Sequence, residues 1–305
     1  MPAYKILSID GGGIRGVLPA SFLAKFATDH EYADPLSRHF NLVAGTSTGA
    51  IIALAVALDV PIAKIKELYV SRGEKVFDRR SFSGPISVFG SKYHNAQLKA
   101  ELEDVFQKRT LGQCVREVCI PAVDIATGKA VIFSRKSHPG ALAWKVALSS
   151  SAAPLYFPSV RFKGDEVLPG LYADGGLWAN NPAMTALAHA VALEHKLEKI
   201  WMLSLGTGDA VARAGLKSSP SGSFSWGSFL VDTVMFSQST GVSTMAQQLL
   251  GRRFHRLNIP LREDECSLDA LNAVARLAQL GAEDYCPPDV KGKIRHHFFS
   301  HPLGN

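Results

Sequence analysis

The chain has 305 residues, of which 47% are hydrophobic and 20% charged, and its formal net charge is +6. At roughly 150 residues per domain this length allows one or two domains, and the composition is that of a globular protein. A disordered chain is excluded, because it would bury too little apolar surface to offset its ordering entropy. The positive charge favours anionic partners such as phospholipid headgroups or nucleotides, but without a clustered basic stripe we expect no nucleic-acid partner.

Membrane insertion and export are not expected from the sequence. The longest uncharged apolar run, residues 50–58, covers about nine residues, whereas a spanning helix needs about 20. No secretory hydrophobic segment precedes the first expected strand. The cysteine spacings match no metal motif, so we expect reduced thiols in a cytoplasmic protein; a Cys266–Cys286 pairing stays open.

Strands and helices are expected to alternate along the first 210 residues. Residues 4–9 and 40–44 read as buried strands that each run into a glycine-rich turn and then a helix, which indicates parallel βα units. We find no internal repeat or linker, so a single α/β domain over residues 1–305 is preferred. Helices are expected at 62–70, 97–108, 141–154, after Asn181-Pro182, and at 268–280 with Ser267 as cap. In the helix expected at 97–108, one face carries Leu98, Leu102, Val105 and Phe106. Further strands are expected at 118–126, 130–134, up to Asp174, at 199–208 and at 253–260, and residues 221–236 stay unassigned.

The strongest local signal is GTSTG at residues 45–49. G-x-S-x-G between a strand and a helix is typical of a nucleophile elbow, in which a tight turn exposes the serine hydroxyl. The helix that follows offers backbone N–H groups for developing negative charge. Ser47 is therefore the candidate nucleophile. The alternative is a glycine turn in which Ser47 only caps the helix.

The glycine-rich stretch at residues 10–16 has two interpretations. Gly11, Gly13 and Gly16 satisfy the dinucleotide fingerprint G-x-G-x-x-G, but the second strand ends without the acidic residue that would hold a ribose. Consecutive glycines also form anion nests, in which bare backbone N–H groups converge on an oxyanion. We favour this second use, with Gly11, Gly12 and Gly13 as donors and Arg15 as added positive charge.

A carboxylate followed by two glycines, Asp174-Gly175-Gly176, ends another expected strand. Asp174 could accept the proton of Ser47 directly, since no histidine sits on an obvious catalytic loop. His189 and His195 lie in an expected helix. An ordinary Asp pKa near 3.9 suits a neutral-pH base poorly, so we expect Asp174 to be partly desolvated.

Three motifs in this order resemble the patatin-like phospholipase family: IDGGGIRG at 9–16, GTSTG at 45–49 and DGG at 174–176. Family-like stretches also occur at 150–158, at Asn181-Pro182 and at 203–208. The likeness covers about residues 4–210, and residues 211–305 are expected to pack on that part. It implies a patatin-like three-layer α/β fold with a mainly parallel central sheet flanked by helices. Thr48 departs from the smaller residue frequent in the family.

The resemblance also implies a lipid acyl hydrolase of phospholipase A type that needs no cofactor or metal. Ser47 would be the nucleophile and Asp174 the general base, with Gly11, Gly12, Gly13 and Arg15 at the oxyanion hole. Its substrate would be a membrane phospholipid, reached by peripheral contact with the inner face of the membrane. Residues 82–93 and 224–236 are candidates for an apolar entrance. Homo-oligomerisation stays open.

Two further hypotheses concern regulation and the absence of catalysis. Compact bacterial members of the family include effectors that cyclic dinucleotides switch on in antiphage defence, so a cyclic-dinucleotide activator is expected by resemblance. The alternative to an enzyme is a non-catalytic module whose glycine-rich loop binds a nucleotide or an anionic lipid.

Overall fold

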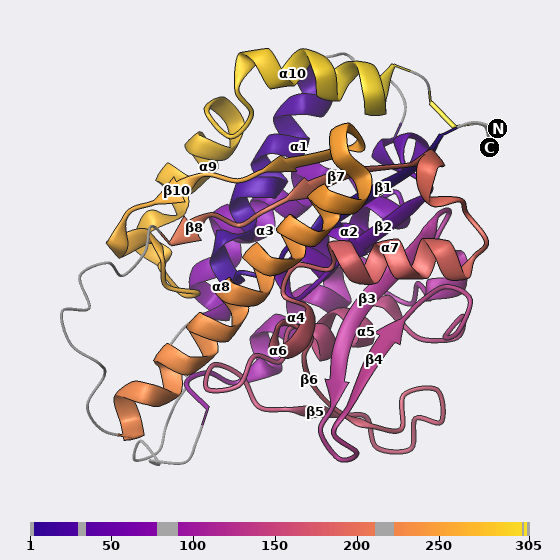
Figure 1. Ribbon diagram of the computed structural model, residues 1–305. Coiled ribbons are helices and arrows are strands. Elements are labelled where there is room, and N and C mark those ends of the chain that lie inside the picture. Colours follow the sequence, from indigo (N-terminus) through magenta and orange to yellow (C-terminus); the bar gives the residue numbers. More distant parts are fainter. Residues whose placement is uncertain (1–2, 30–34, 78–90, 211–222, 301, 304–305) are drawn as a thin grey trace.

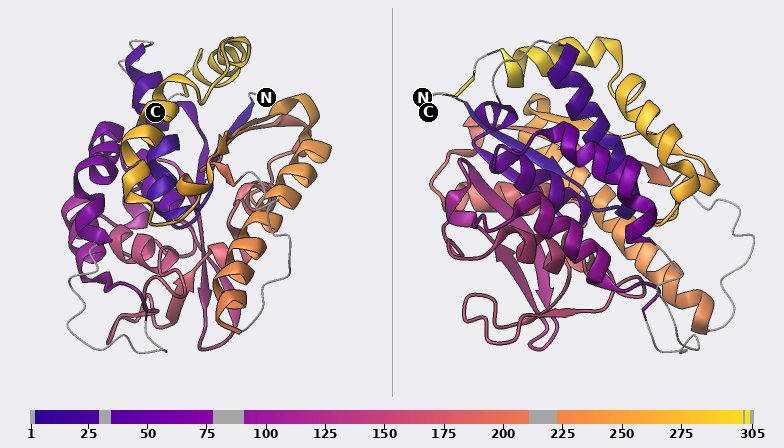
Figure 2. Two further views of the ribbon diagram at one scale, coloured as in Figure 1. Left: turned by 90° about the vertical axis from the view of Figure 1, so that its left-hand side faces the viewer. Right: turned by 180° about the vertical axis from the view of Figure 1, so that it is seen from behind.

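The computed structural model describes residues 3–29, 35–77, 91–210, 223–300 and 302–303, and Figure 1 shows its arrangement. A central sheet lies between two layers of helices, as the edge-on view in Figure 2 makes plain. The expected three-layer α/β architecture is therefore confirmed.

The central sheet has eight strands in the order β5-β6-β3-β2-β1-β7-β9, with β4 paired to β3. Its centre is parallel, because β1 pairs with β2 and β7, β2 with β3, and β7 with β9 in that sense. The β4, β5 and β6 side is antiparallel. The strands are β1 (Tyr4–Ile9), β2 (Leu42–Gly45), β3 (Glu117–Asp124), β4 (Lys129–Phe133), β5 (Val160–Arg161), β6 (Leu171–Asp174), β7 (Ile200–Leu205) and β9 (Phe254–Leu257), and β8 (Asp209–Ala210) pairs separately with β10 (Pro260–Leu261).

Both faces of the central strands are buried, which explains their nearly continuous apolar sequence. Side chains alternate between the faces, so Leu7 and Ile9 of β1 enter one apolar layer and Tyr4 and Ile6 enter the other. The first layer contains side chains of α1 (Val17–Asp29), α2 (Thr48–Ala57), α3 (Ile62–Val76), α4 (Asn95–Phe106), α5 (Ala143–Ser150), α9 (Val274–Glu283) and α10 (Pro288–Ile294). The second contains those of α7 (Ala183–Ala192) and α8 (Ser223–Leu250), and the short α6 (Gly176–Ala179) leads into α7.

The last third of the chain joins the main core. Phe298 and Phe299 are fully buried, and Phe299 packs against Phe26 and Phe40 from the first 40 residues. The apolar layer thus spans residues 7 to 299. A single domain over residues 1–305 stays our prediction, and this shared core supports it.

Several expected elements differ from those observed. Residues 224–236, which periodicity left unassigned, belong to the 28-residue helix α8, although their Ser, Gly and β-branched residues favour helix weakly. Ser267 caps no helix: α9 begins at Val274, because the Ser267 hydroxyl instead donates to Asp269 in a local turn. The helix expected at 141–154 covers only α5, and that expected at 62–70 extends through α3.

Other sequence expectations are confirmed. Leu98, Leu102, Val105 and Phe106 form the buried face of α4. The side chain of Asn181 accepts a hydrogen bond from Ala183 N–H at the start of α7.

Neither Cys266 nor Cys286 forms a disulfide, so the two do not pair. None of the helices in the described ranges is long and apolar enough to cross a bilayer. The same ranges contain no group of three or more His, Cys, Asp or Glu side chains that could hold a metal ion.

Candidate active site

Ser47 sits on a strained turn between β2 and α2. Its backbone has φ 55° and ψ −122°, a conformation that non-glycine residues rarely adopt. The flanking glycines are required for packing: a Cβ on Gly45 would lie 2.1 Å from the Gly49 oxygen, and one on Gly49 would lie 2.3 Å from the Ile9 oxygen. The Ser47 side chain makes no capping hydrogen bond to α2. Ser47 therefore stands at the N-cap position of α2 without capping the helix through its side chain.

Thr48 has room for its side chain because the residue packed against it, Gly16, has none. A Cβ on Gly16 would lie 2.0 Å from Thr48 Oγ1, so only glycine fits there beside the threonine. Thr48 Oγ1 also shares a hydrogen bond with the buried Tyr69 hydroxyl at 2.5 Å. Position 48 can therefore hold a threonine in place of the smaller residue that is frequent in the family.

A second serine fixes the backbone of Ser47. The Ser47 N–H donates to Ser150 Oγ at 3.0 Å, and that hydroxyl donates to the Pro121 oxygen at 2.6 Å. This chain of bonds ties the turn to β3 and α5. We did not single out Ser150 from the sequence, where it lies in a run of three serines at 149–151 and begins the family-like stretch at 150–158.

Asp174 reaches Ser47 because β6 is antiparallel to β3. Along β3, Cys119 lies opposite Ala44 of β2 and Ala122 lies opposite Asp174. The ends of β2 and β6 are therefore only three residues of β3 apart, about 10 Å at the rise of a strand. Ser47 and Asp174 line the same pocket.

Burial raises the pKa of Asp174 to about 7. Hydrogen bonding from the Ser47 hydroxyl and the Gly176 N–H lowers this pKa in part, without cancelling the desolvation. Gly176 N–H donates to Oδ1 at 2.7 Å. Oδ2 is buried and, in the described residues, accepts no hydrogen bond of regular geometry. The expected desolvation of Asp174 is confirmed.

The glycine-rich loop lies beside Ser47 but offers fewer N–H groups than expected. A Cβ on Gly11 would contact Ser47 Cβ at 3.4 Å, and Gly13 lines the pocket. The Gly11 N–H already donates to the Asn180 oxygen at 2.9 Å. The N–H groups of Ile14 and Arg15 also have carbonyl acceptors, which leaves those of Gly12 and Gly13 as donors without a carbonyl acceptor among the described residues.

Arg15 supports the loop. Its Nε donates to the Gly12 oxygen at 3.2 Å, and its charge lowers the pKa of Asp209 against the larger, opposing effect of burial.

The pocket is apolar apart from its reactive end. The space between its walls is about 650 Å³, a figure that includes the open mouth of the pocket. Ser47, Asp174 and Gly13 stand together in its wall. The other walls come largely from α2, α3 and the 153–157 turn, and the large apolar side chains are Ile14, Ile51, Leu68, Val76, Phe77, Leu98, Tyr156, Phe157, Met235 and Leu268. This lining suits an acyl chain.

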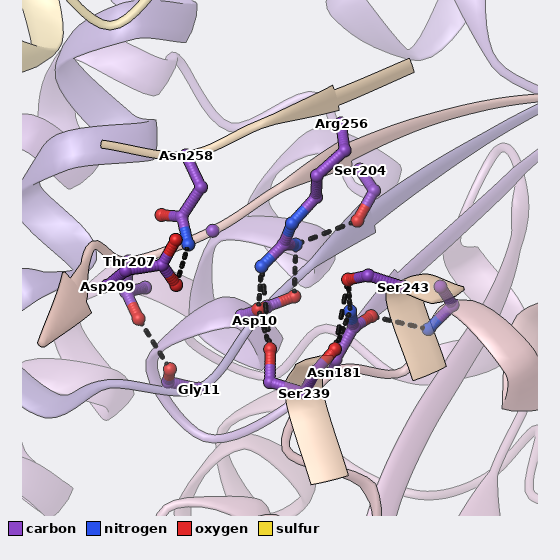
Figure 3. A network of polar contacts seen from close by, with 12 residues as sticks. Asp10, Gly11, Asn181, Ser204, Thr207, Asp209, Ser239, Ser243, Arg256 and Asn258 are labelled. Atoms are coloured by element: carbon purple, nitrogen blue, oxygen red, sulfur yellow. Dashed lines mark hydrogen bonds and ion pairs between the residues drawn. The ribbon is translucent and has the colours of Figure 1, made fainter. Parts of the chain in front are cut away.

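A polar network holds the glycine-rich loop to β7, β8 and β9 (Figure 3). Arg256 on β9 forms a bidentate ion pair with the buried Asp10, at 2.9 Å to Oδ1 and 2.6 Å to Oδ2. Ser239 on α8 donates to Asp10 Oδ2 at 2.9 Å. Thr207 donates to the Gly11 oxygen at 2.6 Å.

Residues from the last third also touch the loop directly. The Leu268 oxygen accepts the Ile14 N–H at 2.8 Å, and a Cβ on Gly13, whose φ is 57°, would lie 2.2 Å from that oxygen. Tyr285 donates to the Gly206 oxygen at 2.6 Å. No motif predicted these contacts for residues 254–285, because they join main-chain atoms to residues far away in the sequence.

The expected apolar entrance lies largely outside the described residues. Of 82–93, only 91–93 are described, and there Tyr93 is buried and, like Lys92, bonds to Asp269. The side chains of Phe224, Trp226, Phe229 and Leu230 are outside the described set. Phe236 is 41% exposed.

A serine on a strand–turn–helix elbow, beside a glycine-rich loop in a three-layer α/β fold, defines the class of the protein. Residues 7–187 match the model of the patatin-like phospholipase family, and the chain belongs to this family. It is 31% identical over 277 residues to a protein of Pseudomonas aeruginosa (strain BWHPSA011 / Pa011) named cGAMP-activated phospholipase, covering 87% of this chain and 81% of that protein.

Other relatives are matched over less of their length. The chain is 30% identical to an Escherichia coli (strain TW11681) protein, also named cGAMP-activated phospholipase, over 68% of this chain and 62% of that protein. It is 30% identical to Patatin-17 of Solanum cardiophyllum, over 67% of this chain and 60% of the relative. A crystal structure of VipD from Legionella pneumophila aligns with a TM-score of 0.44 at 13% identity, over 98% of this chain and 73% of that one.

The Asp10–Arg256 pair yields a stability prediction. Arg256→Leu should lower the free energy of unfolding by about 3–5 kcal/mol, because it leaves the Asp10 carboxylate buried without its partner. Urea denaturation measures the change. Arg72→Leu, which removes the partly exposed ion pair with Glu101, is the matched control and should cost less than about 1 kcal/mol. The double variant Asp10→Asn/Arg256→Leu should recover part of the loss, and an Arg256→Leu effect no larger than the control would contradict the argument.

Proposed function

We propose that the protein hydrolyses fatty-acyl esters of membrane glycerophospholipids, as a phospholipase A, with Ser47 as nucleophile and Asp174 as general base. One observation carries the proposal: a buried carboxyl with a pKa of about 7 shares an apolar pocket with a serine held on a strained turn. A base with a pKa near the working pH combines an ionised fraction with a strong affinity for the proton.

The reaction proceeds by two acyl transfers. Ser47 Oγ attacks the ester carbonyl carbon while its proton passes to Asp174, and the carbonyl oxygen becomes an oxyanion. When the tetrahedral species collapses, the ester C–O bond breaks and Asp174 returns the proton to the leaving lysophospholipid oxygen. Water then attacks the acyl-enzyme, again losing its proton to Asp174, which passes it to Ser47 as the free fatty acid leaves.

The Gly12 and Gly13 N–H groups are the proposed oxyanion donors. Within the part of the chain that the structure describes, these two N–H groups of the loop have no carbonyl acceptor, and Gly13 lines the pocket. One such donor is typically worth about 2.7–4 kcal/mol of barrier. Gly11, which donates to Asn180, and Arg15, which bonds to the Gly12 oxygen, act in this proposal by shaping the loop.

The apolar lining and the net charge support a lipid substrate. A fatty-acyl chain fits the aliphatic and aromatic walls of the pocket, and the charge of +6 favours anionic bilayer surfaces. We place the protein in the cytoplasm, acting in peripheral contact with the inner face of the membrane.

Regulation by a cyclic dinucleotide, in antiphage defence, completes the proposal. The names of the Pseudomonas aeruginosa and Escherichia coli relatives, both called cGAMP-activated phospholipase, support the activation by a cyclic dinucleotide.

Ser47→Ala and Asp174→Asn should each abolish fatty-acid release, because one removes the nucleophile and the other its base. Lipid product analysis by mass spectrometry measures the release. Ser237→Ala and Asp284→Asn, both at exposed positions, are the matched controls and should retain activity. A fluorophosphonate should label the wild type and not Ser47→Ala. Hydrolysis by purified Ser47→Ala, or a wild type that binds lipid without hydrolysis or labelling, would favour the non-catalytic module.

The activity should fall with acidity around the pKa of Asp174. Because the base acts in its ionised form, kcat/KM should decrease about tenfold per pH unit below about pH 7. A pH–rate profile from about pH 5 to 8 measures this limb. The Asp284→Asn control should keep the same limb, and a flat profile over this range would rule out Asp174 as the base.

cGAMP should stimulate hydrolysis. A rise of about 5- to 150-fold corresponds to the usual strength of coupling between two sites. The rate of fatty-acid release is measured during titration with cGAMP at fixed vesicle concentration. A rate that does not change at any concentration would remove this part of the proposal.

A further inference from the structure

A second pocket lies at the opposite edge of the sheet from Ser47. Strands β1, β7 and β9 are parallel neighbours, and the segments that lead into them converge at their amino ends. The pocket there, here called the basic edge pocket, is lined by Ala3, Glu198, Lys199, Trp201, Arg252 and Arg253. Ser47 and the glycine-rich loop follow the carboxyl ends of β2 and β1 instead. The six residues of β1 separate the two edges by about 20 Å.

The basic edge pocket carries an excess of positive charge. Three of its side chains are cationic, and only Glu198 is acidic. Lys199 and Arg252 are exposed, and neither forms an ion pair with any described residue. Arg253 donates to the oxygens of Leu197 and Ile200, which fixes its guanidinium at the pocket wall. Gathered cations repel one another and create a local potential that favours a multivalent anion.

Trp201 adds an aromatic surface to this charge. It is partly exposed and lines the pocket. The His297 ring packs against it with centroids 4.3 Å apart, and His255 stacks at 6.1 Å, so the indole is held in place. An indole beside arginine and lysine is the combination that binds a base by stacking and phosphates by charge.

We propose that the basic edge pocket binds an anionic nucleotide with two phosphate charges, whose base stacks on Trp201 and whose phosphates contact Lys199, Arg252 and Arg253. As the seat of the regulator, this site rests on the proposed function. A membrane fits the pocket less well, because a protein that presents the Ser47 pocket to a bilayer turns the other edge of the sheet away from it.

Strand β9 connects the two edges. Arg253 stands at its amino end in the basic edge pocket, and Arg256, three residues on, holds Asp10 at the base of the glycine-rich loop. A nucleotide that binds Arg252 and Arg253 contacts the residues that directly precede β9. A shift of β9 would move the Arg256 side chain, and with it the loop that carries the proposed oxyanion donors.

Binding of cGAMP, measured by isothermal titration calorimetry, tests the site. Ser47→Ala protein is used, so the measurement does not depend on hydrolysis. Lys199→Glu/Arg252→Glu should weaken binding about 100-fold, because two charge-assisted contacts are lost. Trp201→Leu should weaken it about tenfold through lost stacking. Lys136→Glu/Lys163→Glu changes the net charge equally at exposed loop positions and should bind as the parent does.

The outcomes separate this site from the hydrolase proposal. Absence of cGAMP binding to the parent protein, or equal affinity in Lys199→Glu/Arg252→Glu, overturns the site whatever the lipid assays show. Circular dichroism and thermal unfolding confirm that the variants are folded. Phosphatidylglycerol vesicles form the second arm: if the double variant loses vesicle binding while it keeps its affinity for cGAMP, the pocket is a membrane surface. If cGAMP binds as expected but the wild type releases no fatty acid, only the hydrolase proposal is contradicted.

Discussion

Close backbone packing at the carboxyl ends of β1 and β2 is the constraint on which the candidate site depends. Gly49 at the start of α2 approaches the Ile9 oxygen at the end of β1, and Gly45 approaches the Gly49 oxygen. Neither position has room for a Cβ. This packing sets the positive φ of Ser47 and brings its side chain beside the glycine-rich loop. The strain at Ser47 persists because Ser150 and the surrounding backbone hold it from several directions.

The buried carboxyl of Asp174 illustrates the tension between stability and chemistry. Its folded-state pKa of about 7 lies above the unfolded value, so its ionisation disfavours the folded state as the pH rises from about 4 to about 7. A solvated carboxylate would avoid that cost but would be a weaker base. Burial of apolar side chains offsets this cost, in a core that extends from the first strand to the last aromatic residues of the chain.

The last third of the chain gives the sheet a link between its two edges. Its strand β9 begins at the basic edge pocket and carries Arg256 to Asp10, and its 268 turn contacts Gly13 and Ile14. A region without any recognisable motif therefore shapes the loop that contains the most recognisable one. Helix α8 contributes to the same arrangement through Ser239, which also binds Asp10 (Figure 3).

The sequence by itself determined the features that depend on local sterics and side-chain periodicity. The strand–glycine–helix units, the serine turn, the buried face of α4 and the family were all readable, because each depends on residues close together in the chain. Only the tertiary structure decided the long-range contacts. Arg256 lies 246 residues from Asp10 in the sequence. Lys199 and Arg252 line the same pocket only because β7 and β9 are neighbouring strands. Contacts of this kind follow from strand order, which local patterns do not encode.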